Sequence, residues 1–254
     1  MWIETAQNER LLRIALNRPD KRNALNLDLC RELVAALDLA DSDPRVGAVL
    51  LCGNGKSFCS GMDLTEAATA DPAALSRIHE QLFSVNARIT KPIVAAVHGA
   101  ALAGGTGLVA NAHIVVASED ATFGLTEIRI GLWPFLIFPA LALAIGERRA
   151  VELALTGRIA GAREALEWGL VHRVVAEGET ESAASTIAKQ LSESSPVALR
   201  SGLEFVQEIR RKSWPEAGQI GRRIREQVLQ AGDFVEGLAA FKGKRTPIWP
   251  SLPK

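Results

Sequence analysis

The sequence predicts an α/β protein whose core gives way to helices toward the C-terminus. Two observations support this expectation. Short apolar runs typical of buried strands alternate with helical patterns as far as residue 175. Between residues 179 and 241 only helical patterns remain. This order implies an α/β core with a helical C-terminal portion. We therefore divide the chain into a core at residues 1–195 and a helical region at residues 196–254.

The first elements follow from apolar spacing and from turn residues. Alternation over residues 12–16 predicts a strand, and the polar residues 18–22 predict a turn. Asn26 is suited to cap a helix in which leucines recur at four-residue spacing. Residues 41–44 end that helix, and the apolar run 46–52 predicts the next buried strand.

Further elements are expected in the middle of the chain. Residues 65–80 are polar and alanine-rich, which predicts a mobile helix beside a ligand. Strands are expected at 93–97 and 113–117. After Pro134 the pattern is mainly helical, and it includes a helix from residue 162 to 168 that Gly169 closes. A strand at 171–175 follows.

Composition excludes several classes of function. Acidic and basic residues balance at 29 each, so no polybasic surface is expected for nucleic acid or an anionic membrane. The N-terminus lacks a signal pattern, and polar residues interrupt the later apolar runs, which favours a cytoplasmic protein. Three cysteines, Cys30, Cys52 and Cys59, have no metal-binding spacing, and their odd number argues against a full disulfide framework. No metal site is expected.

A glycine-rich stretch at residues 93–107 suggests where chemistry occurs. An apolar strand breaks into small residues and glycines, and a helical pattern resumes at Leu108. Glycines let backbone N–H groups approach a ligand closely, and the helix N-terminus beyond them adds unpaired N–H groups. Such a place suits an anion, or an oxygen that becomes an anion during reaction.

Two nucleotide-binding motifs fit the glycines poorly. Residues 105–110 match a dinucleotide fingerprint, but the first glycine lies well beyond the strand and the next strand follows too soon. Residues 53–57 look like the end of a phosphate-binding loop, but its leading glycine would fall at Leu50, inside a strand.

Taken together, the two glycine regions, 53–64 and 97–107, resemble the enoyl-CoA hydratase/isomerase (crotonase) superfamily. The resemblance continues in order along nearly the whole chain. It includes the segments 17–26, 123–132, 165–171 and 240–245.

This resemblance implies a fold, a substrate class and an assembly. The fold would be a crotonase-like spiral of ββα turns with an α-helical C-terminal trimerisation region, assembled as a homotrimer or a dimer of trimers. The substrate would be an acyl-CoA thioester, so coenzyme A is part of the substrate and no further cofactor is needed. By position in the motifs, Met62 and Gly104 supply the two backbone N–H groups that bind the thioester carbonyl.

The resemblance also identifies an acid/base. Glu127 occupies the position of the family's second carboxylate, whereas Gly107 stands where two-carboxylate hydratases carry a glutamate. A single carboxylate suffices for isomerisation of 3-enoyl-CoA to 2-enoyl-CoA. The segment after Glu127, however, resembles hydratase-like relatives that also have this glycine. We therefore expect hydration of a 2-enoyl-CoA. The alternatives are an isomerase, an acyl-CoA decarboxylase or C–C hydrolase, and an inactive CoA-binding homologue.

Other residues are assigned to substrate binding or to structure. Residues expected to bind the acyl group or CoA are Lys21, Arg22, Ala24, Ser60, Gly61, Asp63, Leu64, Gly105, Trp133, Phe135, Phe241 and Lys244. His98, His113 and His172 are expected to be structural, and Cys59 to be a packing residue. His79, on the expected mobile helix, could reach the acyl group.

Overall fold

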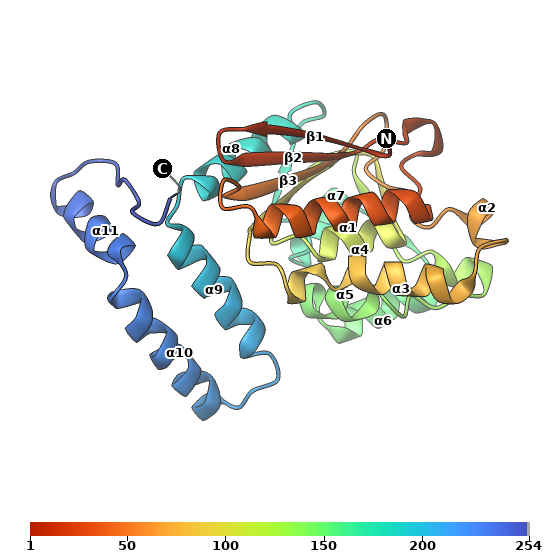
Figure 1. Cartoon of the computed structure of the whole chain (residues 1–254). Helices are drawn as coiled ribbons and strands as arrows, with labels where there is room; N and C mark the ends of the chain where they lie inside the picture. The colour runs from red at the N-terminus through yellow and green to blue at the C-terminus, as the bar shows by residue number, and fades with distance from the viewer. Residues whose placement is uncertain (253–254) are drawn as a thin grey trace.

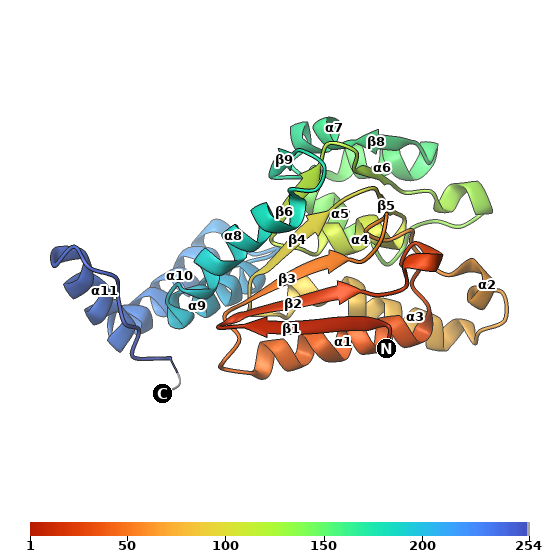
Figure 2. The ribbon, with the colours of Figure 1, turned by 90° about the horizontal axis from the view of Figure 1, so that it is seen from above.

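A six-stranded sheet forms the centre of the computed structural model, which describes residues 1–252 (Figure 1). Its spatial order is β1 (Ile3–Asn8), β2 (Leu11–Leu16), β3 (Ala48–Gly53), β4 (Ile93–Val97), β6 (Ile114–Ser118) and β9 (Arg173–Val175). β1 and β2 form an antiparallel hairpin, and every later pairing in this sheet is parallel. The parallel strands therefore end at one edge of the sheet, where the glycine-rich segments follow β3 and β4 (Figure 2).

Three short strands form a second sheet beside the first. Its order is β5 (Ala100–Leu102), β7 (Thr122–Gly124) and β8 (Ile159–Gly161). Each has three residues, which is too short for alternation to be visible, so the sequence predicts none of them. β1 was not expected either, because five of its six residues are exposed and carry no apolar alternation.

Helices cover both faces of the main sheet. The helices of the core are α1 (Leu27–Ser42), α2 (Leu64–Ala67), α3 (Pro72–Phe83), α4 (Gly104–Ala110), α5 (Phe138–Ile145), α6 (Glu147–Thr156), α7 (Ala162–Glu167) and α8 (Thr180–Ser192). Short 3₁₀ helices lie at Pro19–Lys21, Val85–Ala87 and Glu127–Ile130. The expected cap of α1 is confirmed, because the Asn26 side chain accepts a 3.1 Å hydrogen bond from Leu29 N.

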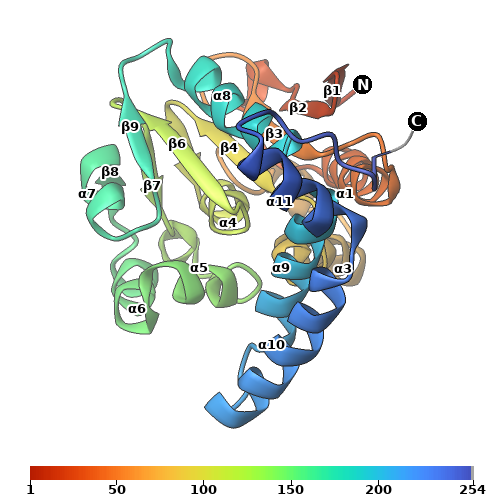
Figure 3. The ribbon, with the colours of Figure 1, turned by 90° about the vertical axis from the view of Figure 1, so that its left-hand side faces the viewer.

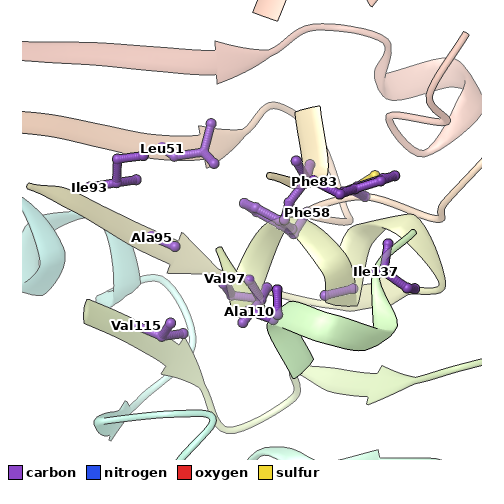
Figure 4. Packing of buried hydrophobic residues seen from close by; sticks show 14 of the residues in the cluster. Leu51, Phe58, Phe83, Ile93, Ala95, Val97, Ala110, Val115 and Ile137 are labelled. Atoms are coloured by element: carbon purple, nitrogen blue, oxygen red, sulfur yellow. The ribbon is translucent and has the colours of Figure 1, made fainter. Parts of the chain in front are cut away.

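Alternate residues of the central strands face two separate hydrophobic clusters. Leu50, Val94 and Val116 pack with Ala184 and Ala188 of α8 on one face. Their neighbours along the same strands, Leu51, Ala95 and Val115, point the opposite way, into the larger cluster beneath α1 and α3 (Figure 4). This two-residue alternation fixes the register of the strands. Because both faces of the sheet are buried, the strands appear in the sequence as continuous apolar runs.

Three helices form an arm that projects from the core (Figures 1 and 3). They are α9 (Pro196–Glu208), α10 (Trp214–Leu229) and α11 (Gly232–Lys242). α9 and α10 bury no residue within this chain. Large apolar side chains on the arm are exposed to solvent, among them Trp214, which is 92% exposed, and Phe241, which is 84% exposed.

Two expected helices differ in the structure. α4 begins at Gly104, not at Leu108, so Gly104, Gly105 and Gly107 lie in its first turn. The single helix expected at residues 65–80 is instead two helices, α2 and α3. Asp63 caps α2 and Asp71 caps α3, each by accepting hydrogen bonds from backbone N–H groups. No helix in residues 1–252 combines the length and apolarity needed to cross a membrane.

Candidate active site

A cavity of about 490 Å³ opens at the edge of the sheet where β3 and β4 end. The loop after β3, the helices α2 and α3, the start of α4 and the segment from Thr126 to Ile137 surround it. Seven residues expected in the site line it together: Ser60, Met62, Leu64, Gly104, Glu127, Trp133 and Phe135.

The two glycine-rich loops touch each other at this cavity. Gly61 has φ +92°, and a Cβ placed on it would lie 2.9 Å from Leu102 O and 3.2 Å from Gly104 N. Since real Cβ contacts are not this close to backbone, only glycine allows the loops to approach so tightly. Leu25 N also donates to Gly61 O at 2.8 Å, which ties the first loop to the start of α1.

Two backbone N–H groups at this contact are unpaired. Leu25 N donates to Gly61 O, and Asp63 N donates to Leu25 O. Between them, Met62 N has no backbone acceptor in residues 1–252. Gly104 is the first residue of α4, and its N–H likewise has no acceptor in the described chain. Both residues line the cavity. A carbonyl oxygen that enters the cavity can therefore accept two hydrogen bonds that the protein itself leaves free.

Glu127 brings a carboxylate to the same cavity. It begins the 3₁₀ helix after β7, and its Oε2 is buried without a hydrogen-bond partner in residues 1–252. Burial raises the pKa of this carboxyl above the usual glutamate range. A carboxyl whose pKa is raised holds a proton more readily than an ordinary one, which suits a group that takes up and returns a proton.

At Gly107, where two-carboxylate hydratases carry a glutamate, other side chains fill the space that a side chain would need. A Cβ placed on Gly107 would lie 2.9 Å from Ile137 Cβ and 3.1 Å from Phe83 Cδ1. Ile137 and Phe83 are 3% and 6% exposed and belong to the core cluster (Figure 4). Nothing in the spacing of the sequence pointed to either side chain, because both are distant from residue 107 along the chain.

His79 is the second titratable side chain at the cavity. It lies on α3, is 7% exposed, and its ring centroid is 5.5 Å from that of Phe83. Burial lowers the pKa of its imidazole to about 4, so the ring is neutral at pH 7. Its Nε2 is buried with no partner in the described part of the chain.

The rest of the cavity wall is largely apolar. Trp133, Phe135 and Leu136 line it, as expected of an acyl pocket, whereas Phe138 packs beside Trp133 and is not part of the lining. No lysine or arginine is among the lining residues.

Several residues expected to bind CoA lie outside the cavity wall. Lys21 and Arg22 are exposed on the turn that precedes Ala24, whose carbonyl accepts a 2.7 Å bond from Arg18 Nη1. Asp63 forms a 2.8 Å ion pair with Arg18 and caps α2, which are structural contacts. Gly105 packs against the Cys59 backbone, where a Cβ would lie 3.0 Å from the carbonyl carbon.

The expected binding residues of the arm do not join the cavity within one chain. Phe241 and Lys244 are exposed at and just beyond the end of α11, which lies at the opposite end of the molecule from α2 (Figure 2). Arg245 is held by Glu236 through bonds of 2.6 and 2.8 Å.

The remaining histidines and Cys59 make structural contacts. His113 Nδ1 accepts from Ile93 N at 3.0 Å, and His172 Nδ1 accepts from Val115 N at 3.1 Å. His98 Nε2 lies 2.8 Å from Gly55 O. Cys59 is fully buried, and burial raises its thiol pKa to about 12. No cluster of three potential metal ligands occurs in residues 1–252.

Comparisons with known proteins agree with this geometry. Residues 6–251 match the family model described as enoyl-CoA hydratase/isomerase. An enoyl-CoA hydratase of Mycobacterium tuberculosis is 37% identical over 92% of this chain and 91% of its own. The 2,3-dehydroadipyl-CoA hydratase of Escherichia coli is 35% identical over 95% and 96%. A solved structure of enoyl-CoA hydratase from Bacillus anthracis superposes with a TM-score of 0.92 at 32% identity, covering 99% and 100% of the two chains.

Proposed function

The chain belongs to the enoyl-CoA hydratase/isomerase family, and from this membership we propose that it adds water to a 2-enoyl-CoA to give a 3-hydroxyacyl-CoA. The crotonase-like fold expected from the sequence is confirmed by the structural match. The observation that carries the proposal is the meeting of two unpaired backbone N–H groups and one buried carboxylate at a single cavity.

Met62 N and Gly104 N are proposed as the oxyanion hole. When the thioester carbonyl accepts both hydrogen bonds, electron density is drawn from the conjugated double bond and the β-carbon becomes electrophilic. Water oxygen then bonds to Cβ, and the π electrons move to an enolate whose oxygen the same two donors stabilise. One such donor typically contributes about 2.7–4 kcal/mol to the transition state.

Glu127 is proposed to move the proton. Its carboxylate removes one proton from the attacking water and delivers a proton to Cα as the enolate collapses. Atoms then balance, because one molecule of water has been divided between Cβ and Cα. The raised pKa favours this double role, since a carboxyl of ordinary acidity holds its proton too weakly at neutral pH to return it efficiently.

The acyl group is proposed to be uncharged and apolar. Leucine, isoleucine, proline, tryptophan and phenylalanine side chains form most of the cavity wall, and no cation among the lining residues could pair with a distal carboxylate. Coenzyme A is bound as part of the substrate, and no further cofactor is proposed.

A homotrimer, or a dimer of trimers, is the proposed assembly. It is supported by the exposed apolar residues of an arm in which no residue of α9 or α10 is fully buried within one chain. Assembly would also let Lys244 approach the CoA of a neighbouring copy. A cytoplasmic location remains a prediction from the sequence.

Product analysis tests the proposed reaction. Wild-type protein is incubated with a panel of 2-enoyl- and 3-enoyl-CoAs of different chain lengths, and products are identified by mass spectrometry. We expect 3-hydroxyacyl-CoA from the 2-enoyl substrates. Double-bond migration without addition of water would instead identify an isomerase.

Gly104→Pro tests the oxyanion hole. Proline removes the N–H and its φ suits the first turn of a helix, but it also strains Ala103, whose φ of 50° and ψ of −118° are disfavoured before proline. Gly104→Ala is the matched control, because it brings a Cβ equally close to Leu25 and Phe83 but keeps the N–H. Turnover should fall by a further factor of about 10²–10³ in the proline variant relative to the alanine variant. Equal turnover would remove Gly104 N from the mechanism.

A further inference from the structure

Two of the four orphaned polar atoms in residues 1–252 belong to residues that line the same cavity. Side-chain atoms that are buried without a hydrogen-bond partner are His79 Nε2, Glu127 Oε2, Thr180 Oγ1 and Arg210 Nε. Of these four residues, His79 and Glu127 line the cavity. A buried polar atom without a partner in the protein is suited to bind a polar group or a water that enters the cavity with the substrate.

Hydration needs a second group to hold the water. Glu127 can bind one O–H of the attacking water, but a water fixed by a single bond is free to rotate away from Cβ. Position 107 cannot supply another polar group, because Ile137 and Phe83 occupy the space beside it. The polar partner must therefore come from another element of the cavity wall.

α3 provides that element. Its Phe83 packs over both Gly104 and Gly107, and His79 lies one turn earlier on the same helix with its ring in contact with Phe83. His79 thus projects from the helix face that covers the start of α4. It is buried and lines the cavity that contains Glu127.

We propose that His79 Nε2 binds the attacking water and, with Glu127, fixes it over the substrate β-carbon. This inference rests on the proposed hydratase function and adds a residue to it. The ring is neutral at neutral pH, so it offers a hydrogen bond without transferring a proton. Glu127 remains the group that accepts the proton from water and passes one to Cα.

The test separates holding water from moving protons. A saturated acyl-CoA can exchange its α-hydrogens with solvent, a step that needs the oxyanion hole and Glu127 but no attacking water. Two rates are compared for each variant: hydration of a 2-enoyl-CoA, and deuterium uptake at Cα of the saturated analogue in D₂O.

His79→Phe keeps an aromatic ring of similar size and removes both ring nitrogens, Nε2 among them. We expect hydration to fall about 10- to 100-fold, the usual effect of losing one hydrogen bond to a buried group, while deuterium uptake stays near the wild-type rate. His79→Gln, whose amide can still bind water, should recover part of the hydration rate. Glu80→Gln, an exposed neighbour on α3, is the matched control and should change neither rate.

Three outcomes contradict the assignment. If His79→Phe lowers hydration and exchange equally, or lowers neither, His79 does not hold the water. If it alters the fold, His79→Leu, which also lacks a hydrogen-bonding group, decides the matter, and an unchanged ratio of the two rates in that folded variant overturns the proposal. A wild-type protein that exchanges α-hydrogens but never hydrates a 2-enoyl-CoA would instead overturn the proposed function, and this inference with it.

Discussion

Ile137 occupies the space into which a side chain on Gly107 would project, because a Cβ placed on residue 107 would lie 2.9 Å from Ile137 Cβ. The glycine and the isoleucine therefore depend on each other. From the sequence alone, a glutamate restored at position 107 could be imagined to anchor a water molecule. The packing opposes this, because Gly107 does not line the cavity and the space beside it is occupied by Ile137 and Phe83, which do.

Gly107→Ala should destabilise the protein by about 1–3 kcal/mol through overpacking, although alanine ordinarily favours a helix. Chemical denaturation measures the change. Gly202→Ala on α9 is the matched control, because nothing lies within 4 Å of its added Cβ, and it should be neutral or slightly stabilising. Ile137→Ala should lower the free energy of unfolding less when it is introduced into Gly107→Ala than when it is introduced into the wild type. Strict additivity of the two changes would contradict the contact.

His79 and His113 should make stability depend on pH. Burial lowers the pKa of each to about 4, below the usual value of 6.5. As pH falls from 6.5 toward 4, the unfolded chain binds protons that the folded chain excludes, so the free energy of unfolding decreases. Each histidine should contribute a loss of about 2 kcal/mol by pH 5.

Urea unfolding at pH 7 and pH 5 measures this loss. The decrease should be smaller in His79→Phe than in wild type, because the variant lacks one of the two buried imidazoles. An identical decrease in both proteins would show that His79 titrates normally in the folded state.

Lys244→Ala should raise the KM for acyl-CoA and leave kcat largely unchanged, as expected when uniform binding is lost. The effect should shrink with added salt if it is electrostatic. Lys212→Ala, an exposed lysine between α9 and α10, is the control. An unchanged KM at low salt would mean that Lys244 is only solvated. Arg245→Ala is a poor probe of CoA binding, because Arg245 is paired with Glu236.

Much of the fold could be predicted because its signals are local. The buried strands at residues 46–52 and 93–97 and the Asn26 cap are visible in short windows of sequence, and the structure has them within two residues. The second sheet could not be predicted, because three-residue strands have no period to detect. The sequence predicts the start of α4 four residues late, since glycines oppose a helix locally while tight packing against the Cys59 backbone and Ile137 requires them there.

For the site, too, the residues carried by local segments could be predicted, and the contacts between distant segments could not. Met62, Gly104 and Glu127 belong to recognisable segments, and the structure brings them to one cavity. Ile137 and Phe83 fill position 107 through contacts between distant segments, which no sequence window contains. His79 could be named as a candidate from its helix, but its burial and its unpaired Nε2 depend on how α3 docks on α4.

The central claim is that Glu127 carries the proton at the substrate α-carbon. Glu127→Gln preserves the size and the hydrogen bonding of the side chain but removes its ability to shuttle a proton, so acyl-CoA should still bind. General acid–base catalysis contributes about 10²–10⁴-fold, and hydration should fall by at least that order.

Solvent deuterium incorporation at Cα, compared in wild type and Glu127→Gln, is the most direct measurement. It follows the proton itself. We predict rapid incorporation in wild type and a loss of about 10²–10⁴-fold in Glu127→Gln, with acyl-CoA affinity retained. Equal rates of incorporation in the two proteins would contradict the account, because the proton would then be moved by another group.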